Sequence, residues 1–569
     1  MNQYHEDDSG EPEPSVPPGR DISGSIRRRA WIAGLLVALA AVGGAWALSS
    51  PVGSSPDDDF HLASIWCGAL APDELCQPTQ RATDSSGDGL AKLGNGVRGV
   101  RIPGEIGPGA LCYVFDATKS AACQADIDPA LTESRANGGL YPDGFYQLLG
   151  IFASDDTGRS VVLMRLASFT MAMGLIVGAL AVARPSTRRA YFLAVLATSV
   201  PLGLFLFSST NPSGLASASM GATFVCAVGF LRSRNLRELR ATAVMGVLAA
   251  AAGLSARSDA GLYLAAVCAC ALLFERAWRR PLRRRAAAVV VTGLVGLAWL
   301  TLSTQTSAAA DGISGQSLDR PWTAVLWTNI INLPSLWAGS LGWNWGLGWL
   351  DTRLPETTGL GMVFVAAGLL FWGLGDARAA KLASGTVAVL AITAAPLWLL
   401  SADGEVVGET VQPRYLLPML PVILTIALLP NHRKFLRLTR VQLGVVATIV
   451  CIAQSLALHT NIRRYVSGQD RQGLNLNSNV EWWWSNAWSP MAVWMIGTIA
   501  FAAVVVIGMT KGTDLLRLAS AERDVEADRS ATQDQDVLPV ERDGEVAGPG
   551  SESNRPTELE AGRFDERAE

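Results

Sequence analysis

The segment Arg27–His61 reads RRRAWIAGLLVALAAVGGAWALSSPVGSSPDDDFH and joins three arginines, a long apolar run and three adjacent aspartates. An apolar run of this length is sufficient for an α-helix to cross the hydrocarbon core of a bilayer. Its arginine-led start resembles a secretory signal peptide, but the run ends without a small-x-small cleavage site. We therefore predict a retained first membrane helix, with the aspartates at one lip of the membrane.

The composition of the whole chain extends this prediction. Its 569 residues are 49% hydrophobic and 17% charged, with a mean hydropathy of +0.26, which is typical of a polytopic membrane protein. Recurring apolar runs predict about twelve spans and an all-α membrane domain over residues 30–510. We expect these spans near 30–50, 160–183, 190–208, 212–231, 241–256, 259–275, 286–304, 358–375, 383–401, 414–430, 441–459 and 489–510. The two shortest, 241–256 and 259–275, are either separate helices or one re-entrant pair.

Basic residues concentrate in every second loop between these spans, and the short loops on the other side hold almost none. Positively charged loops favour the cytoplasm, so the alternation predicts that both termini are cytoplasmic. The bases of the expected inner loops are Arg184, Arg188 and Arg189; Arg232, Arg234, Arg237 and Arg240; the run from Arg276 to Arg285; Arg378 and Lys381; and Arg433, Lys434, Arg437 and Arg440. The same alternation places three long loops outside, at residues 51–158, 304–357 and 461–489. Because the bases occupy short loops of this kind, we expect no nucleic-acid binding.

The two ends of the chain differ in composition from the predicted membrane domain. Residues 1–29 are mostly polar and rich in proline and glycine, and residues 511–569 are acidic and poor in aromatic residues. Such segments cannot bury enough apolar surface to fold. We predict that both are disordered cytoplasmic tails.

Four of the eight cysteines lie in the first outer loop, at Cys67, Cys76, Cys112 and Cys123. Cysteines outside the cytoplasm commonly form disulfides, so we expect two of them here. Three pairings are possible, and short loop closure favours Cys67–Cys76 with Cys112–Cys123. Zinc binding is a poorer interpretation because no CxxC spacing is present.

The aspartates Asp57, Asp58 and Asp59 have two interpretations. In the structural one, Ser55 caps a helix, Pro56 occupies its first position, and the acids complement the positive end of the helix dipole. An apolar stripe on the membrane surface would then follow, formed by Leu62, Ile65, Trp66 and Ala69. In the functional one, Asp57 or Asp58 is a general base or a metal ligand, and His61, one turn further on, can meet either carboxylate.

An acidic motif that opens a long outer loop directly after the first span resembles the GT-C superfamily of membrane glycosyltransferases. Those enzymes transfer a sugar from a polyprenyl-phosphate carrier on the outer face, and this acidic motif is their catalytic or metal-binding site. Several stretches also resemble a bacterial family of predicted multi-pass membrane proteins of unknown function that is related to GT-C. They are PDDDFHLASIW (56–66), YPDGFYQLLG (141–150), SSTNPSGLA (208–216), GSLGWNWGLGWLDTRLP (339–355) and QPRYLLPMLP (412–421). The resemblance covers roughly residues 30–510. That family often has an acidic residue after Asn-Pro, where this chain has Ser213, which weakens a role for the 208–216 loop.

Two other outer motifs contain arginine and also have two interpretations each. Arg414 and Tyr415 lie at the mouth of a span, where an arginine either snorkels to the interface or clamps a lipid phosphate with its bidentate guanidinium. Arg257 and Asp259 lie in a short outer turn. They form either a structural ion pair, which we favour, or a second phosphate contact.

The tryptophan-rich stretch before Asp351 forms a third motif. Trp343 and Trp345 lie among glycines, and an interfacial aromatic belt is the default interpretation. The alternative is an acceptor groove, in which a sugar stacks on the aromatic rings and Asp351 supplies a second outer carboxylate.

Taken together, the resemblance implies a GT-C-like sugar transferase of the bacterial plasma membrane. The donor would be a polyprenyl-phosphate sugar and the acceptor an envelope glycan or protein. Asp57 or Asp58 would act as base or hold a divalent cation such as Mg²⁺ or Mn²⁺, while Arg414 would bind the phosphate. A multi-pass transporter or lipid flippase is the first alternative, disfavoured because charges are nearly absent from the expected spans. A non-catalytic scaffold for envelope assembly is the second.

Overall fold

The structure, a computed structural model, describes residues 22–80, 96–279, 282–303, 320–402, 404–409, 411–430 and 438–510. The expected C-terminal tail, 511–569, lies outside these residues. So does most of the expected N-terminal tail, 1–29, although the first helix already begins at Ile22.

Nine helices of the described residues are long and apolar enough to cross a membrane, which confirms the multi-pass helical fold. They are α1 (Ile22–Leu48), α4 (Thr157–Val182), α7 (Ser213–Arg232), α8 (Leu236–Ala256), α10 (Arg283–Leu302), α13 (Glu356–Leu374), α14 (Ala379–Ala402), α16 (Arg440–Val466) and α17 (Pro490–Thr510). The three remaining expected spans contain shorter helices: α5 (Pro185–Thr198) with α6 (Leu202–Phe207), α9 (Ala260–Glu275) and α15 (Leu420–Leu428). An additional helix, α12 (Trp322–Gly339), occupies part of the expected second outer loop.

Prolines explain why two of the expected spans are interrupted. Pro201 separates α5 from α6, because proline lacks the N–H that a continuing helix needs and clashes with the preceding turn. Near the other span, Pro413 opens a short 3₁₀ turn, and α15 begins only at Leu420. Both interruptions lie next to the loops that build the candidate site.

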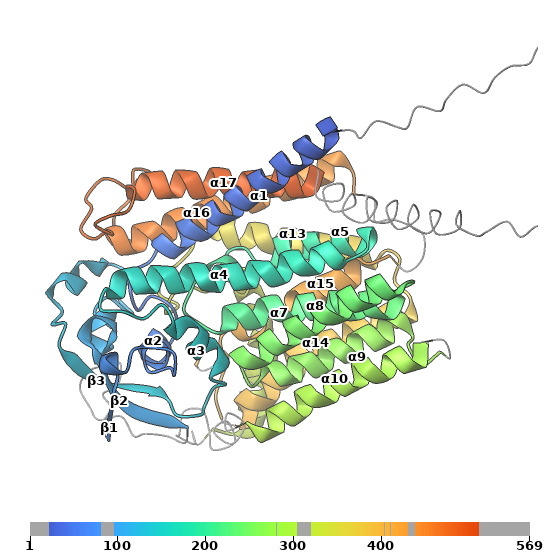
Figure 1. Cartoon of the computed structure of the whole chain (residues 1–569), viewed down its shortest axis with the longest axis horizontal. Coiled ribbons are helices and arrows are strands. Elements are labelled where there is room, and N and C mark those ends of the chain that lie inside the picture. Colours follow the sequence, from blue (N-terminus) through green and yellow to red (C-terminus); the bar gives the residue numbers. More distant parts are fainter. Residues whose placement is uncertain are drawn as a thin grey trace, which may run out of the picture. The chain divides into compact units, whose positions relative to one another are not determined.

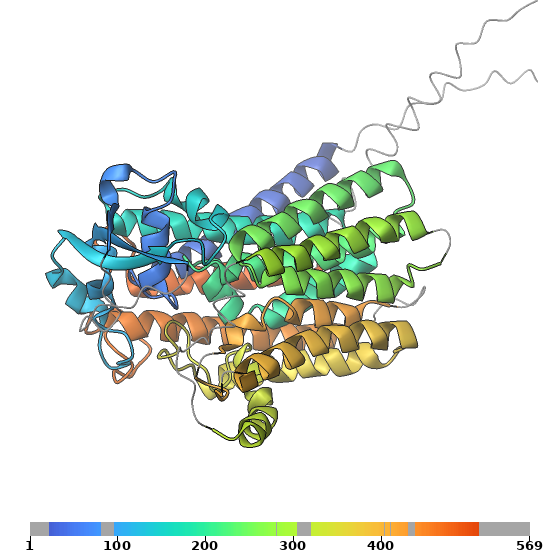
Figure 2. The same cartoon turned by 90° about the horizontal axis from the view of Figure 1, so that it is seen from below.

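The helices run side by side, and the first outer loop lies at one end of them (Figures 1 and 2). The loops after α6, α8 and α14 reach the same end. Thr210 and Arg414 form hydrogen bonds with the first outer loop, and Arg257 forms one with the first residue of α7, close to Thr210 in the chain. At the opposite end, Arg184 pairs with Glu238, and Arg232 pairs with Glu275. The loops that the sequence assigns to the two sides of the membrane therefore gather at two different ends.

The first outer loop folds around a small antiparallel sheet. Its strands are β1 (Gln77–Thr79), β2 (Val97–Pro103) and β3 (Leu131–Asn137), in the order β1-β2-β3. In the β2–β3 register, Gly99 faces Arg135. The sheet packs on α2 (Asp58–Trp66) and α3 (Gly144–Gly150), with buried residues such as Leu62, Ile65, Trp66, Val100, Ile102 and Leu149 in the shared core.

The same loop contains both expected disulfides. Cys67 pairs with Cys76 and Cys112 with Cys123, which confirms the pairing favoured by short loop closure. The expectation of an apolar stripe on the membrane surface is wrong. Every residue of α2 is buried, because the sheet and α3 cover the helix and leave no free apolar face.

Candidate functional site

The candidate site begins where the chain turns from α1 into α2. The helix cap is Asp57 rather than Ser55, and its backbone is left-handed, with a φ of 59° and a ψ of 26°. Ser55 instead donates its backbone N–H to Asp58 Oδ2 at 2.9 Å, so the expected capping roles of Ser55 and Pro56 are wrong. The left-handed turn separates Asp57 from its two acidic neighbours, and the three carboxylates contact different partners.

Asp58 is fully buried and fastens α2 to the loop that precedes α7. Its Oδ1 accepts a hydrogen bond from Thr210 Oγ1 at 2.6 Å. The neighbouring Asn211 donates to the carbonyl of Pro56 at 2.8 Å. Burial raises the pKa of Asp58 to about 6, and the bonds from Thr210 and Ser55 oppose this rise. With both carboxylate oxygens engaged, Asp58 holds the loop in place rather than facing a ligand.

Asp57 is the partly exposed carboxylate of the three. Its side chain is 38% exposed, and its Oδ2 lies 2.5 Å from Arg414 Nη2. Burial raises the pKa of Asp57, but the attraction of the Arg414 charge outweighs this effect and leaves the pKa below its ordinary value. Asp57 is therefore an ionised carboxylate at neutral pH.

Arg414 lies beside a second arginine, and both line one small cavity. Arg257 donates two hydrogen bonds to Asp259, at 2.8 and 2.7 Å, and a third to Ser213 Oγ at 3.0 Å. The Tyr415 ring is 4.9 Å from the Arg257 guanidinium carbon and 5.1 Å from that of Arg414. The polar residues that line the cavity are Ser213, Arg257, Asp259, Tyr263, Arg414 and Tyr415.

The guanidinium of Arg414 is only partly satisfied. Its Nη2 bonds to Asp57 and to Tyr415 Oη. Its Nε and Nη1 are buried and have no acceptor among the described residues. A buried donor without a partner costs free energy, and a buried cation more so. The two groups can bind a ligand that carries acceptor oxygens.

Aromatic residues and a further ion pair surround the acidic turn. Asp59 pairs with Arg135 at 2.7 Å. His61 Nδ1 lies 2.9 Å from Tyr146 Oη, and its ring lies edge-on to Tyr141, with centroids 5.5 Å apart. Burial lowers the pKa of His61 to about 3, so the imidazole is neutral at physiological pH. His61 therefore packs in an aromatic wall and does not pair with Asp57 or Asp58 as an ion.

The carboxylates do not form a ready metal site. Among the residues that the structure describes, no group of three or more histidine, cysteine, aspartate or glutamate side chains is placed to hold a metal ion. Asp58 uses both oxygens in hydrogen bonds, and Asp57 and Asp59 pair with different arginines. The donor set does not fit Mg²⁺ or Mn²⁺, which need several converging oxygens.

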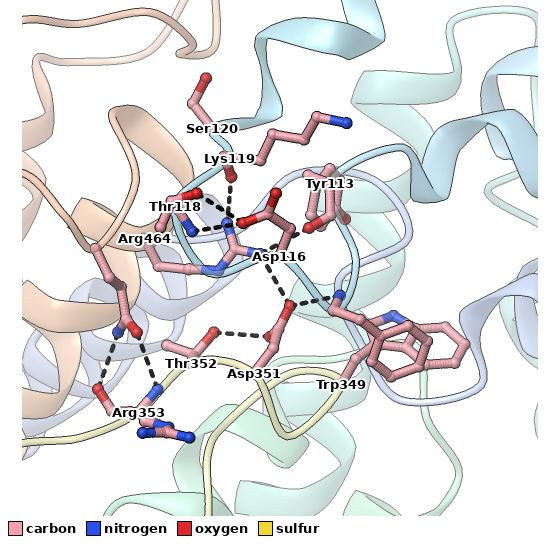
Figure 3. A network of polar contacts seen from close by, with 12 residues as sticks. Tyr113, Asp116, Thr118, Lys119, Ser120, Trp349, Asp351, Thr352, Arg353 and Arg464 are labelled. Atoms are coloured by element: carbon pink, nitrogen blue, oxygen red, sulfur yellow. Dashed lines mark hydrogen bonds and ion pairs between the residues drawn. The ribbon is translucent and has the colours of Figure 1, made fainter.

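Asp351 belongs to a separate polar network (Figure 3). Its Oδ2 accepts from the buried Arg464 at 2.9 Å and from the backbone N–H of Phe115 at 3.1 Å. Arg464 also donates to the carbonyls of Tyr113, at 2.8 Å, and Lys119. The network ties α16 to the first outer loop and to the end of the tryptophan-rich stretch, at Asp351.

The contacts of the two predicted tryptophans are with residues other than the acidic turn. Trp345 Nε1 donates to Ser335 Oγ at 3.1 Å, and its ring packs against Gly339. The backbone of Trp343 lies directly against Gly359 of α13. Trp349, rather than either of these, reaches the segment between α1 and α2, through a 2.8 Å bond from its Nε1 to the carbonyl of Gly53.

Sequence reasoning missed Arg165, which lies within the span α4. This buried arginine donates to the carbonyls of Ala47, Ser50 and Pro51 and to Ser54 Oγ, at 2.5 to 3.0 Å. A lone arginine inside an apolar run was the available signal, because such residues usually have a specific partner. The loop after α6 was also underestimated, since Thr210, Asn211 and Ser213 all bond to site residues.

One comparison with known protein families supports a membrane protein. No curated protein and no solved structure matches the chain. The family model of a predicted membrane protein, DUF2142, matches residues 40–423, which is more than half of the chain and includes the acidic turn, both cavity arginines and Tyr415. The chain therefore belongs to the DUF2142 family of predicted membrane proteins.

Proposed function

We propose that this protein is a membrane glycosyltransferase that moves a sugar from a polyprenyl-phosphate donor to an acceptor of the cell envelope. The observation that carries the proposal is the buried Arg414, whose Nε and Nη1 have no acceptor among the described residues and which shares a small cavity with Arg257. The ionised Asp57 lies beside it. A cation for the phosphate and a carboxylate for the acceptor are thereby adjacent.

The donor groups of the two cavity arginines suit the phosphate of a lipid carrier. Guanidinium groups bind phosphate oxygens through charge-assisted hydrogen bonds, which are stronger than neutral ones. One carboxylate balances each cavity arginine, namely Asp57 for Arg414 and Asp259 for Arg257. A phosphate on the two buried donors of Arg414 that have no acceptor among the described residues would compete with Asp57 for that guanidinium and release the carboxylate toward the acceptor.

The transfer then needs few further groups. The acceptor hydroxyl oxygen attacks the anomeric carbon of the donor sugar, its proton passes to Asp57, and the bond from that carbon to the phosphate oxygen breaks. The electron pair leaves with the phosphate, whose added charge Arg414 and Arg257 stabilise. Attack on the face opposite the phosphate inverts the anomeric centre. Asp58 acts as a positioning residue through Thr210 and Ser55.

The same proposal assigns the end of the helices that carries the first loop and its β-sheet, called the sheet end below, to the outer face of a bacterial plasma membrane. Two disulfides in the first loop favour an oxidising compartment. The arginine-rich loops at the opposite end favour the cytoplasm, where we also place both termini.

A transfer assay tests this function. Purified wild-type protein, Asp57→Asn and the exposed first-loop variant Asp126→Asn would receive radiolabelled polyprenyl-phosphate sugars and an envelope extract. We expect label to move to the extract with wild type and Asp126→Asn, and at least 100-fold more slowly with Asp57→Asn. Movement of the intact labelled lipid across a vesicle membrane, without transfer, would instead favour the transporter or flippase alternative. Equal transfer by all three proteins would reject Asp57 as the base. No transfer from any donor, with no lipid movement, would favour a scaffold.

A further inference from the structure

A second cavity, of about 580 Å³, lies among the membrane helices. It is lined by α1, α4, α5, α6, α16 and α17 and shares no lining residue with the small cavity of the candidate site. Figure 1 shows α1 and α17 together on one side, with α4 and α5 beyond them. The volume falls within the range of about 300–1,000 Å³ that is usual for ligand pockets.

The walls of the second cavity are almost entirely apolar. The polar residues among its described lining are Arg188, Arg189, Ser199 and Thr510. Water does not fill an apolar space of this kind, and an empty one would forfeit dispersion contacts along its walls. Exposed apolar residues such as Leu36, which is 58% exposed, belong to the same lining. In a bilayer, hydrocarbon chains are therefore the material that fits this cavity and can reach it.

The second cavity has the depth of one leaflet. Its lining on α17 extends from Phe501 to Thr510, which is the last residue of that helix. Such a stretch rises by about 14 Å in an α-helix. This is about half of the roughly 30 Å hydrocarbon core of a bilayer. The cavity therefore suits a lipid of a single leaflet, at the end of the helices opposite the sheet end.

Two arginines lie where the cavity meets the membrane surface. Phe192 of α5 packs against Gly508, near the end of α17, so the start of α5 with its arginines lies beside that end. Arg188 is buried and donates to three carbonyls at the end of α4, at 2.7 to 3.3 Å. Arg189 is exposed. The six lining helices contain no aspartate or glutamate, so this rim is positively charged.

We propose that the second cavity binds an anionic phospholipid, with an acyl chain between the helices and the phosphate on Arg189. Guanidinium groups bind phosphate oxygens through charge-assisted hydrogen bonds. Basic pockets between membrane helices recognise anionic headgroups through the same attraction. A zwitterionic lipid would fill the apolar part equally well but would leave the charge of the rim unbalanced. This site does not depend on the proposed sugar transfer.

Native mass spectrometry of the protein in detergent tests the headgroup. Wild type would be titrated with phosphatidylglycerol and with phosphatidylcholine of the same acyl chains. We expect phosphatidylglycerol to bind roughly tenfold more tightly and Arg189→Gln to lose this preference. The control Arg234→Gln, which removes an exposed arginine outside the cavity, should keep it. Equal affinity of wild type for the two lipids, or an unchanged preference in Arg189→Gln, would overturn the assignment.

A second set of variants tests the acyl chain. Val504 lines the cavity, whereas Val506 on the same helix does not and is 56% exposed. Val504→Trp fills part of the cavity and should weaken phosphatidylglycerol binding roughly tenfold, while Val506→Trp should bind like wild type. Leu36→Trp, at an exposed position of the lining, is a second filling variant that leaves the packed interior intact.

Unchanged lipid binding in both filling variants would show that the chain lies elsewhere and would overturn the assignment. An excess of inorganic phosphate should leave the lipid bound, because the chain supplies most of the contact. Displacement by inorganic phosphate would show a site for free phosphate alone and would also overturn it.

Discussion

Arg414 Nη2 lies 2.5 Å from Asp57 Oδ2, so one ion pair joins residues that are 357 positions apart in the chain. The pair brings together the acidic turn after α1 and the proline-rich turn before α15. The two side chains differ in solvent exposure, because Arg414 is buried while Asp57 is partly exposed. A ligand can therefore reach the pair from the side of the carboxylate and meet the cation behind it.

The buried Arg165 makes a prediction about stability. Replacing it by Met would leave three carbonyls and the Ser54 hydroxyl without a donor in a buried place. Each unsatisfied group costs about 1–3 kcal/mol, so we expect a loss of roughly 3 kcal/mol or more. Thermal unfolding in detergent measures it, with the exposed Arg189→Met as a control. A wild-type midpoint for Arg165→Met would show that these bonds do not hold the acidic turn.

The raised pKa of Asp58 makes a prediction about pH. Its pKa is about 6 in the folded protein, above the ordinary aspartate value of 3.8, so the native state binds the proton more tightly than the unfolded chain does. Stability from this group is therefore present at low pH and is lost as the pH rises from about 4 to about 6, by about 3 kcal/mol at most. Thermal unfolding from pH 7 to pH 4 should show this slope in wild type and lack it in Asp58→Asn. The same dependence of stability on pH in both proteins would contradict the raised pKa of the buried Asp58 carboxyl.

The first-loop cysteines make a prediction about thiol labelling. Unreduced, denatured protein should expose only the thiols of Cys226, Cys268, Cys270 and Cys451. After reduction, labelling of Cys67, Cys76, Cys112 and Cys123 should appear as well. Peptide mapping of the unreduced protein would identify the two pairs. Recovery of a peptide that links Cys76 to Cys112 would contradict the pairing.

The two ends of the helices make a prediction about topology. Single cysteines introduced at the exposed Asp126, in the first loop, and at the exposed Arg237, near the start of α8, would be probed in intact cells of a cysteine-free variant. If the sheet end is outside, a membrane-impermeant maleimide should label the first and not the second. Labelling of Arg237→Cys alone would reverse the proposed orientation.

Much of the fold could be predicted from local patterns. Apolar runs are dense enough to locate the long helices, and a separation of nine or eleven residues made the disulfide pairs predictable. The interruption at Pro201 was harder to foresee, since the apolar run continues through it. Arg165 was overlooked for the same reason, because fifteen or more apolar neighbours conceal one charge in a hydropathy pattern.

Single residues of the candidate site could be predicted from the sequence, but their arrangement could not. Asp57, Arg257 and Arg414 were each named, but nothing local in the sequence shows that Asp57 and Arg414 meet. Asp351 was named as a second outer carboxylate of an acceptor groove, and its pairing with Arg464 was not foreseen, because it depends on the tryptophan-rich stretch folding toward the end of α16. A long-range pairing depends on the packing of the whole helix bundle, which local periodicity does not encode.

Equilibrium binding of the carrier lipid tests the central claim most directly. Wild-type protein in nanodiscs would be titrated with a polyprenyl phosphate and with the matching neutral polyprenol. We expect the phosphate to bind at least tenfold more tightly than the alcohol, and Arg414→Ala to abolish this preference. Asp57→Asn should keep it, because a neutral amide then replaces the carboxylate that competes for Arg414. Equal affinity of the wild-type protein for the phosphate and the alcohol, or an unchanged preference in Arg414→Ala, would contradict the account.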